Sequence, residues 1–374
     1  MKIQFEKNPE QIELIKALAS ENKTVAMQAQ EAFAAFISDV VLQVLLQAST
    51  AGLVYRDIEF DEDDQPSIPL DLYYGQQEGT ISVWSQTVGG GLPSSFVQGM
   101  NEMKVNTYRL DSAISMEKRY VRRARLDVVA AGLERMANEL LVKQERNAWA
   151  VVLKALAEAQ TLNKDHVQRV GTDGVFQLDD MNKLWTLIRR INAAYTGGTP
   201  SNLQFRGLTD IFVSPEVKEQ IRGFAYQPMN TRTGSTGTTQ SNTAIALPDS
   251  VREEIYRGAG TQEIFGVTIH ELLELGTSRK YNDLFGAFSS KNYTTAAGTG
   301  SAAFSSSADD LIVGIDSTRN AFLRPVAIQS ESRGQVKVLP DDQFLARSQK
   351  VGFYSYVEEG RVVTDARAVV GLLV

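Results

Sequence analysis

A proline-free stretch over residues 116–160 constrains the fold more than any other feature of this sequence. It holds a single glycine, Gly132, and its apolar residues recur at intervals of three and four. This spacing predicts one face of an α-helix, far longer than the dozen or so residues of an average helix. At about 1.5 Å per residue, even its central part predicts a rod of roughly 50–60 Å. The apolar positions are Leu126, Val129, Leu133, Met136 and Leu140, resumed at Ala148, Val152, Leu156 and Ala159.

Segments in which polar and apolar residues alternate precede the long helix. They cover residues 53–60, 65–70, 81–88 and 103–110. A period of two predicts strands with one buried and one exposed face. Because no helical pattern separates them, we expect hairpins that project from a body and not a sheet of strand–helix–strand units.

The N-terminal residues predict another helix. Asn8, Pro9 and Gln11 combine a capping residue, proline at the first helical position and a glutamine that can complete the cap. The apolar residues that follow at helical spacing are Phe33, Phe36, Ile37, Val40, Val44 and Leu45. This apolar face either packs on its own domain or needs a partner subunit, and the sequence leaves both interpretations open.

Shorter elements are predicted after the long helix. Residues 179–194 and 216–224 predict helices, and 211–213, 265–269, 321–328, 335–339, 351–356 and 361–364 predict strands. Small polar residues dominate 230–238 and 286–307, which predicts loops. The almost wholly apolar residues 368–374 are expected to be buried.

Composition excludes several classes of function. The 374 residues contain no cysteine and two histidines, so disulfides, thiolate nucleophiles and cysteine-ligated zinc are excluded. The net charge of −7 is unlike that of a protein whose task is to neutralise nucleic-acid phosphates. No uninterrupted apolar run approaches the length of a membrane span, and we expect a soluble protein without a membrane partner.

Catalytic motifs are also missing. No Gly-Lys pair occurs, so no phosphate-binding loop exists, and no nucleophile elbow is present. His270 and Glu271 resemble the start of a zinc-protease motif, but the second histidine is absent and the context predicts a strand. We therefore expect no catalytic residue and no cofactor, and interpret His270 as structural.

Two charged clusters of opposite sign remain to be explained. The acidic run consists of Asp57, Glu59, Asp61, Glu62, Asp63 and Asp64, and the basic run of Lys118, Arg119, Arg122, Arg123 and Arg125. The carboxylates could hold calcium or magnesium, in which case a metal-assisted hydrolase is conceivable, or form a solvated hairpin tip. The basic run has one aromatic residue, Tyr120, and is a poor nucleic-acid patch. A third interpretation, which we adopt, is that it receives the acidic run of a neighbouring subunit.

The order of elements resembles the major capsid proteins of tailed bacteriophages, which have the Hong Kong 97-like fold. Residues 91–96, followed by 103–110, look like the return of that family's extended loop. Residues 114–117 look like the entry into its spine helix. Residues 211–216 and 264–269 resemble the strand-Ser-Pro-helix and Phe-Gly segments of its axial domain, and 347–370 its closing strands.

The resemblance implies an α+β fold in four parts. These are an N-terminal arm (1–50), an extended β-hairpin loop (51–106), a peripheral domain with the spine helix (107–170 and 320–355) and an axial domain (171–319 and 356–374). The implied function is a self-assembling subunit of an icosahedral phage head that encloses double-stranded DNA, without catalysis. An encapsulin-like nanocompartment shell protein is the alternative.

Partners and location also follow from the resemblance. It implies a homo-oligomer of pentamers and hexamers, with cement, scaffolding and portal proteins as further partners. The DNA would be enclosed without sequence-specific binding. The protein would be part of the virion and would assemble in the host cytoplasm.

Overall fold

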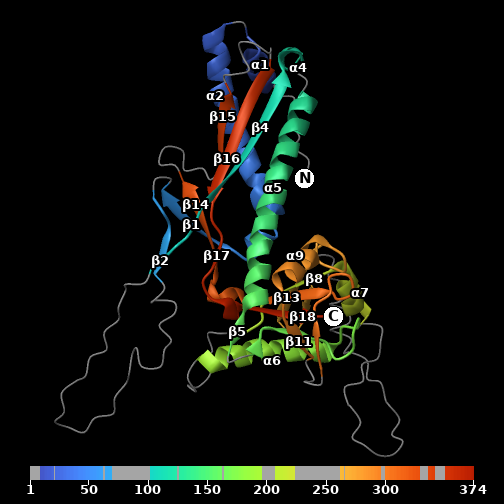
Figure 1. Cartoon of the computed structure of the whole chain (residues 1–374). Helices are drawn as coiled ribbons and strands as arrows, with labels where there is room; N and C mark the ends of the chain where they lie inside the picture. Colours follow the sequence, from blue (N-terminus) through green and yellow to red (C-terminus); the bar gives the residue numbers. More distant parts are fainter. Residues whose placement is uncertain are drawn as a thin grey trace, which may run out of the picture. The chain divides into compact units, whose positions relative to one another are not determined.

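The computed structural model describes residues 9–20, 22–61, 64–69, 102–123, 126–161, 164–195, 207–223, 262–264, 266–295, 300–328, 336–341 and 350–374. The chain divides into two units that interleave along the sequence (Figure 1). The first unit comprises Met1–Tyr73, Gln98–Ala148 and Phe322–Val362, and the second comprises Tyr74–Val97, Trp149–Ala321 and Val363–Val374. Helices and sheets are mixed in both, as the α+β prediction requires. The finer four-part division stays a prediction.

The sheet of the first unit is built on strand β16 (Lys350–Glu359). Strand β4 (Tyr108–Glu117) pairs antiparallel with it over its whole length, from Glu117 beside Lys350 to Tyr108 beside Glu359. Strand β15 (Lys337–Asp341) pairs with Gly352–Tyr356 of β16, and β14 (Phe322–Ile328) pairs with the last residue of β16, Val326 beside Glu359. Strand β1 (Arg56–Asp61) lies parallel to β14 at the edge of the sheet.

Helices cover one face of this sheet. Alternate residues of β16, among them Val351, Phe353 and Val357, share a core with α2 (Lys23–Ala48) and α5 (Leu126–Glu158). The ring of Phe353 lies 5.4 Å from that of Phe33 on α2. On the opposite face, the Arg109 guanidinium lies 3.7 Å from the ring centre of Tyr356, and Leu339 is 39% exposed.

The N-terminal helical prediction is confirmed in position and divided in two. Helix α1 (Pro9–Leu18) begins at the predicted proline, and α2 follows it. Residues 23–42 are long and apolar enough, by length and composition, to cross a membrane. However, Phe33, Ile37 and Val41 are buried in the core of the unit. Of the two interpretations, packing on its own domain therefore holds for these residues.

The predicted helix over 116–160 is wrong at its beginning. Met116 and Glu117 end β4, a short helix α4 (Lys118–Arg122) follows, and α5 begins only at Leu126. The reason is tertiary: β4 pairs residue by residue with β16, and the alternation of Leu110, Ile114 and Met116 places them against the core. The residues that resemble the entry into a spine helix are thus the end of a strand.

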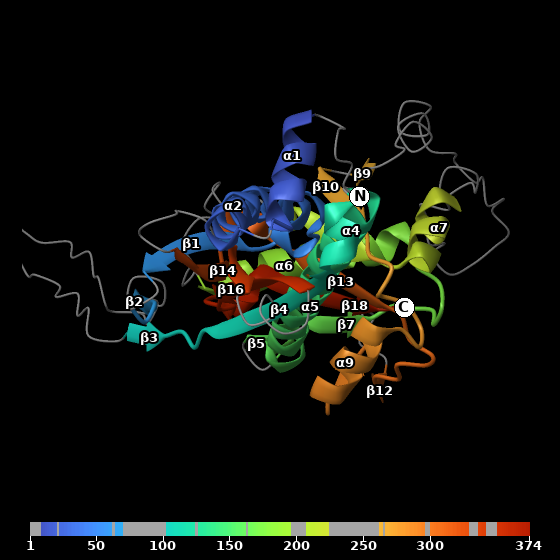
Figure 2. The ribbon, with the colours of Figure 1, turned by 90° about the horizontal axis from the view of Figure 1, so that it is seen from above.

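Of the predicted hairpin, the structure describes only the base. Strands β2 (Ser67–Pro69) and β3 (Glu102–Lys104) pair antiparallel and lie side by side near the end of β1 (Figure 2). The predicted strand 81–88 and the family-like segment 91–96 lie outside the described residues.

The second unit is a mixed sheet between two helical layers. The strand order is β7 (Val167–Arg169), β18 (Val369–Leu373), β13 (Leu311–Ile315), β8 (Asp210–Val213), β10 (Val267–Glu271) and β9 (Gln262–Ile264). Helices α6 (Leu178–Tyr195) and α7 (Pro215–Gly223) pack on one face, as the helical predictions require. Trp149 packs on the other, with its ring 4.8 Å from Phe212. Because β13 and β18 are covered on both sides, all their residues are buried, including the apolar C-terminal segment predicted to be so.

One loop prediction is wrong. Within 286–307, strands β11 (Asn292–Thr294) and β12 (Ser301–Ala303) pair after helix α9 (Lys280–Phe288). Three aromatic residues form a small core that the composition of this segment did not predict. The ring of Phe285 lies 6.0 Å from that of Tyr293 and 4.9 Å from that of Phe304. The remaining small elements are the paired strands β5 (Gln160–Thr161) and β6 (Lys164–Asp165), the short helices η2 (Ser317–Arg319) and η3 (Ala366–Ala368), and strand β17 (Val362–Val363), which is shorter than predicted.

Gly314 tests the packing of the second unit. A Cβ atom at this position would lie 2.6 Å from Leu208 Cδ1 and 3.1 Å from Val370 Cγ2. We expect Gly314→Ala to lower the free energy of unfolding by about 1–3 kcal/mol, measured by urea denaturation. Gly171→Ala is the matched control, because nothing lies within 4 Å of its added Cβ. Equal stability of the two variants would contradict this account of the packing.

Candidate functional site

The acidic run forms part of an edge strand. Asp57, Glu59 and Asp61 lie on β1 and are exposed, and Asp64 follows in a turn, with its backbone N–H donating to Asp61 O at 2.9 Å. The hairpin-tip interpretation is thus wrong for the three strand residues, because β1 pairs with β14 along its length. Glu62 and Asp63 lie outside the described residues.

The basic run surrounds the short helix α4. Arg119, Arg122 and Arg123 are exposed, whereas Lys118 is partly buried. Arg119 Nε lies 2.5 Å from Glu117 Oε2, and its guanidinium lies 4.9 Å from the ring centre of Tyr120. Arg125, predicted to extend the basic face, lies outside the described residues.

The structure separates the two runs within one chain. Helix α4 follows the end of β4 that pairs with Lys350, whereas β1 is joined through β14 to the opposite end of β16, where Val326 pairs with Glu359 (Figure 1). The ten residues of β16 span about 33 Å. The acidic strand of one chain therefore cannot reach its own basic helix without unmaking this sheet.

The described carboxylates of the acidic run, those of Asp57, Glu59, Asp61 and Asp64, form no metal-binding group. Across the described parts of the chain, no group of three or more Asp, Glu or His side chains could hold an ion. His270, the other candidate, lies on β10, where its Nε2 is 3.0 Å from Asp210 Oδ1 and its ring stacks on Phe212. The predicted strand and structural role of His270 agree with these contacts.

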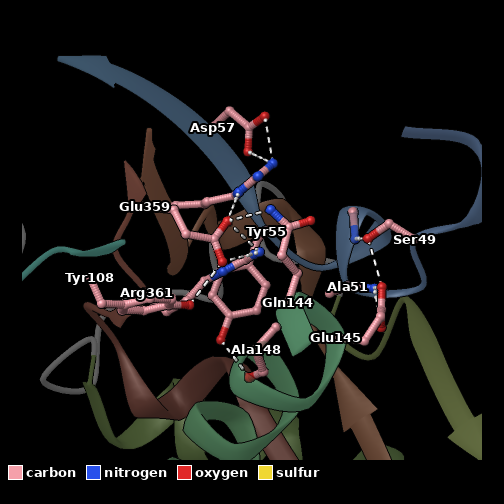
Figure 3. Close-up of polar contacts among 12 residues, drawn as sticks. Ser49, Ala51, Tyr55, Asp57, Tyr108, Gln144, Glu145, Ala148, Glu359 and Arg361 are labelled. Atoms are coloured by element: carbon pink, nitrogen blue, oxygen red, sulfur yellow. Dashed lines mark hydrogen bonds and ion pairs between the residues drawn. The ribbon is translucent and has the colours of Figure 1, made fainter. Parts of the chain in front are cut away.

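A buried polar cluster, absent from the sequence predictions, lies where β16 ends in the first unit (Figure 3). At its centre is the Glu359 side chain, which is 0% exposed. Arg324 Nε donates to Glu359 Oε2 at 2.7 Å, and Arg361 Nη2 donates to the same oxygen at 3.2 Å. Tyr108 donates from its hydroxyl to Oε1 at 2.8 Å, and Gln144 donates to Oε2 at 3.2 Å. These five residues are called the Glu359 cluster below.

The Glu359 cluster joins four elements. Arg324 comes from β14, Tyr108 from β4 and Gln144 from α5, while Glu359 ends β16. Arg324 also reaches Asp57 of the acidic run, with Nη1 3.4 Å from Oδ2. Burial, followed by the negative charge of Glu359, raises the pKa of Tyr108 to about 12, which keeps this hydroxyl a donor. The cluster thus ties the acidic strand to the main sheet.

The adjoining chain segment is held by a second carboxylate. Glu145 on α5 accepts hydrogen bonds from Ser49 Oγ at 2.7 Å, Thr50 Oγ1 at 2.6 Å and Ala51 N at 3.1 Å. These contacts begin the short helix η1 (Ala51–Leu53), which leads from α2 into β1. Tyr55 then packs beneath Arg361, 4.7 Å from its guanidinium, and donates from its hydroxyl to Ala148 O at 2.9 Å.

A signal for the Glu359 cluster was present in the sequence. On β16, every second residue from Val351 is buried, through Phe353, Ser355 and Val357. Extending the same period by two steps beyond the predicted strand 351–356, to 357 and then 359, places Glu359 on the buried face. A carboxylate at such a position requires basic partners, but nothing in the sequence names Arg324 and Arg361 as those partners.

Comparisons with known proteins place phage capsids among the similar structures, as the sequence resemblance predicted. The capsid structure of the cyanophage P-SCSP1u has a TM-score of 0.49 and 13% identity, covering 85% of this chain and 86% of that chain. The capsid of an empty GTA particle gives 0.45 and 12%, covering 87% and 89%. A virus-like particle from Pyrococcus furiosus gives 0.40 and 11%, covering 91% and 99%.

Sequence comparisons add nothing to these similarities. No protein-family model matches the chain, and no curated protein matches it.

Removing the central carboxylate tests the Glu359 cluster. Glu359→Ala leaves the buried Arg324 and Arg361 without their shared partner, and we expect a loss of roughly 3–5 kcal/mol in unfolding free energy. Asp57→Asn removes a contact at the partly exposed rim and is expected to cost less than about 1 kcal/mol. Urea denaturation monitored by circular dichroism measures both, and a mild effect of Glu359→Ala would contradict a central role for this carboxylate.

The buried carboxyl of Asp310, in the second unit, is expected to make the free energy of unfolding depend on pH. Burial raises the pKa of Asp310 to about 6, and the nearby Glu216 adds to the effect, although Ser214 Oγ donates to Asp310 Oδ2. The folded pKa exceeds the ordinary value of 3.8, so folding favours the protonated form. The contribution of this carboxyl to stability is therefore fully present below about pH 4 and is lost, by up to about 3 kcal/mol, as the pH rises through 6.

Asp310→Asn tests this assignment because an amide cannot ionise. We expect the variant to lose the decline in unfolding free energy between pH 4 and about pH 7. Asp173→Asn, at an exposed position, is the control that keeps the decline. Unfolding curves across this range measure the difference, and an unchanged slope in Asp310→Asn would exclude this carboxyl as the cause.

Proposed function

We propose that this protein is a self-assembling shell subunit with the Hong Kong 97-like fold, and that its shell is an icosahedral phage head around double-stranded DNA. The observation that carries the proposal is the position of the two charged runs at opposite ends of β16. Each chain offers an acidic edge and a basic end that it cannot join by itself.

Such a surface favours contacts between copies. When two different patches of one chain are complementary, copies associate head to tail, and this association closes into rings if the rotation between neighbours allows it. Exposed ion pairs contribute only about 0–1 kcal/mol each, but they set register and reject wrong partners. Rings of five and six copies are the elements from which an icosahedral shell is built.

The sequence resemblance supplies the remaining parts of the proposal. Residues 107–170 and 320–355 would form the peripheral domain, 171–319 and 356–374 the axial domain, and 51–106 the extended loop. Scaffolding, portal and cement proteins would be further partners, and the virion, assembled in the host cytoplasm, would be the location. The net charge of −7 suits a container that does not adhere to its DNA, and we assign no residue a catalytic role.

Charge reversal in the basic run tests the proposal. We expect Arg122→Glu with Arg123→Glu to reduce particle yield at least tenfold, because the acidic edge of the neighbour would then be repelled. Thermal unfolding of the dilute protein should change little, since both arginines are exposed. Sedimentation and negative-stain microscopy measure the particles.

Two further variants sharpen this experiment. Arg135→Glu with Lys143→Glu makes the same change in net charge at exposed positions of α5 and should leave assembly intact. A single chain that combines Arg122→Glu and Arg123→Glu with Glu59→Lys and Asp61→Lys should form particles again, because its two reversed runs are once more of opposite sign. Normal particles from the Arg122/Arg123 variant alone would reject the proposed pairing.

Particles that carry protein cargo and no DNA would favour the nanocompartment alternative.

A further inference from the structure

The fold brings a lysine from the N-terminal helix to the basic run. Helix α1 lies against α4 at the same end of the first unit (Figure 1, Figure 2). Ile15 and Leu18 of α1 and Val121 of α4 belong to one buried core. Lys16, in the last turn of α1, is exposed beside these core residues. A cation remote in the sequence therefore lies at the end of the molecule that carries α4.

A second lysine reaches the same end from β16. Lys350 lies directly opposite Glu117 in the antiparallel register of β16 and β4. Because every second residue from Val351 is buried, Lys350 and Glu117 share the other, open face of the sheet. Glu117 is already paired with Arg119, and among the residues that the structure describes neither Lys16 nor Lys350 makes an ion pair.

The row of carboxylates on the acidic strand is longer than the basic helix. Asp57, Glu59 and Asp61 follow one face of β1, and the outer two lie about 13 Å apart along the strand. The five residues of α4 rise only about 7.5 Å. A strand laid along or across α4 therefore places part of this row beyond the helix, over the residues that flank it.

The carboxylates of this row are unequally matched within their own chain. Asp57 is paired with Arg324, whereas Glu59 and Asp61 are exposed and have no ion pair in the described parts of the chain. Two unmatched carboxylates on the edge strand thus correspond in number and in sign to the two unmatched lysines beside α4.

We propose that Lys16 and Lys350 belong to the contact between copies, where they hold carboxylates of the neighbour's acidic strand that extend past α4. This inference rests on the proposed shell function, and it adds to the contact two residues that the basic run of the sequence does not contain. Each exposed pair contributes little by itself, but several pairs around α4 fix the position of the strand on this surface.

Removing the two lysine charges tests this inference. Lys16→Gln with Lys350→Gln does so without placing a second carboxylate opposite Glu117. We expect the lowest protein concentration at which particles form, measured by sedimentation, to rise at least threefold, while thermal unfolding of the dilute chain changes little. Arg135→Gln with Lys143→Gln, at exposed positions of α5, removes the same charge and should assemble like the unmodified chain.

A second comparison identifies the anion that the lysines hold. In a chain that carries Glu59→Gln and Asp61→Asn, studied at a concentration high enough for it to assemble, the lysine changes should have no further effect. The carboxylates that they bind are already neutral in that chain. A full additional loss would show that the lysines attract a different anion, such as nucleic-acid phosphate, and would overturn the inference.

The outcomes separate this inference from the proposed function. If the lysine variant assembles like the unmodified chain while Arg122→Glu with Arg123→Glu does not, the lysines lie outside the contact and the shell function stands. If the unmodified chain itself forms no particles, the proposed function is wrong and this inference is wrong with it.

Discussion

A carboxylate with no exposed surface must be matched by positive charge and hydrogen bonds, and Glu359 imposes this requirement on the first unit. Its partners come from β14, β4, α5 and the residue pair that follows β16. Segments that are hundreds of positions apart in the sequence are thereby held in one geometry. The register of the sheet and the position of the acidic edge strand both depend on this match, because Arg324 serves Glu359 and Asp57 at once.

The sheet that this cluster terminates acts as a spacer. β4 and β16 pair over their full length, so one end carries the basic helix α4 and the other carries the acidic strand β1. In the proposed shell, this separation would leave the attraction between the two runs to act between neighbouring chains. The second unit contributes differently: its central strands are buried on both faces, and burial raises the pKa of its Asp310 carboxyl.

Several elements were predictable because local pattern and final environment agree. Helix α6 and strands β8, β10 and β14 occur where periodicity placed them, and the apolar C-terminus is buried. The failures share one cause. Residues 114–117 have a composition that suits either a helix or a strand, and they form a strand because they pair with β16. Residues 292–303 look like a loop, but Phe285, Tyr293 and Phe304 give them a local core.

By itself, the sequence determined the mixed fold class, most helices, the two charged runs and the absence of cysteine chemistry, because these follow from residue type and spacing along the chain. Only the tertiary structure decided that Asp57, Glu59 and Asp61 lie on an edge strand, that the basic run lies toward the other end of the ten-residue strand β16, and that Glu359 is buried in contact with Arg324 and Arg361. Those outcomes depend on which distant strands pair and which side chains lose contact with water, and no local pattern carries that information.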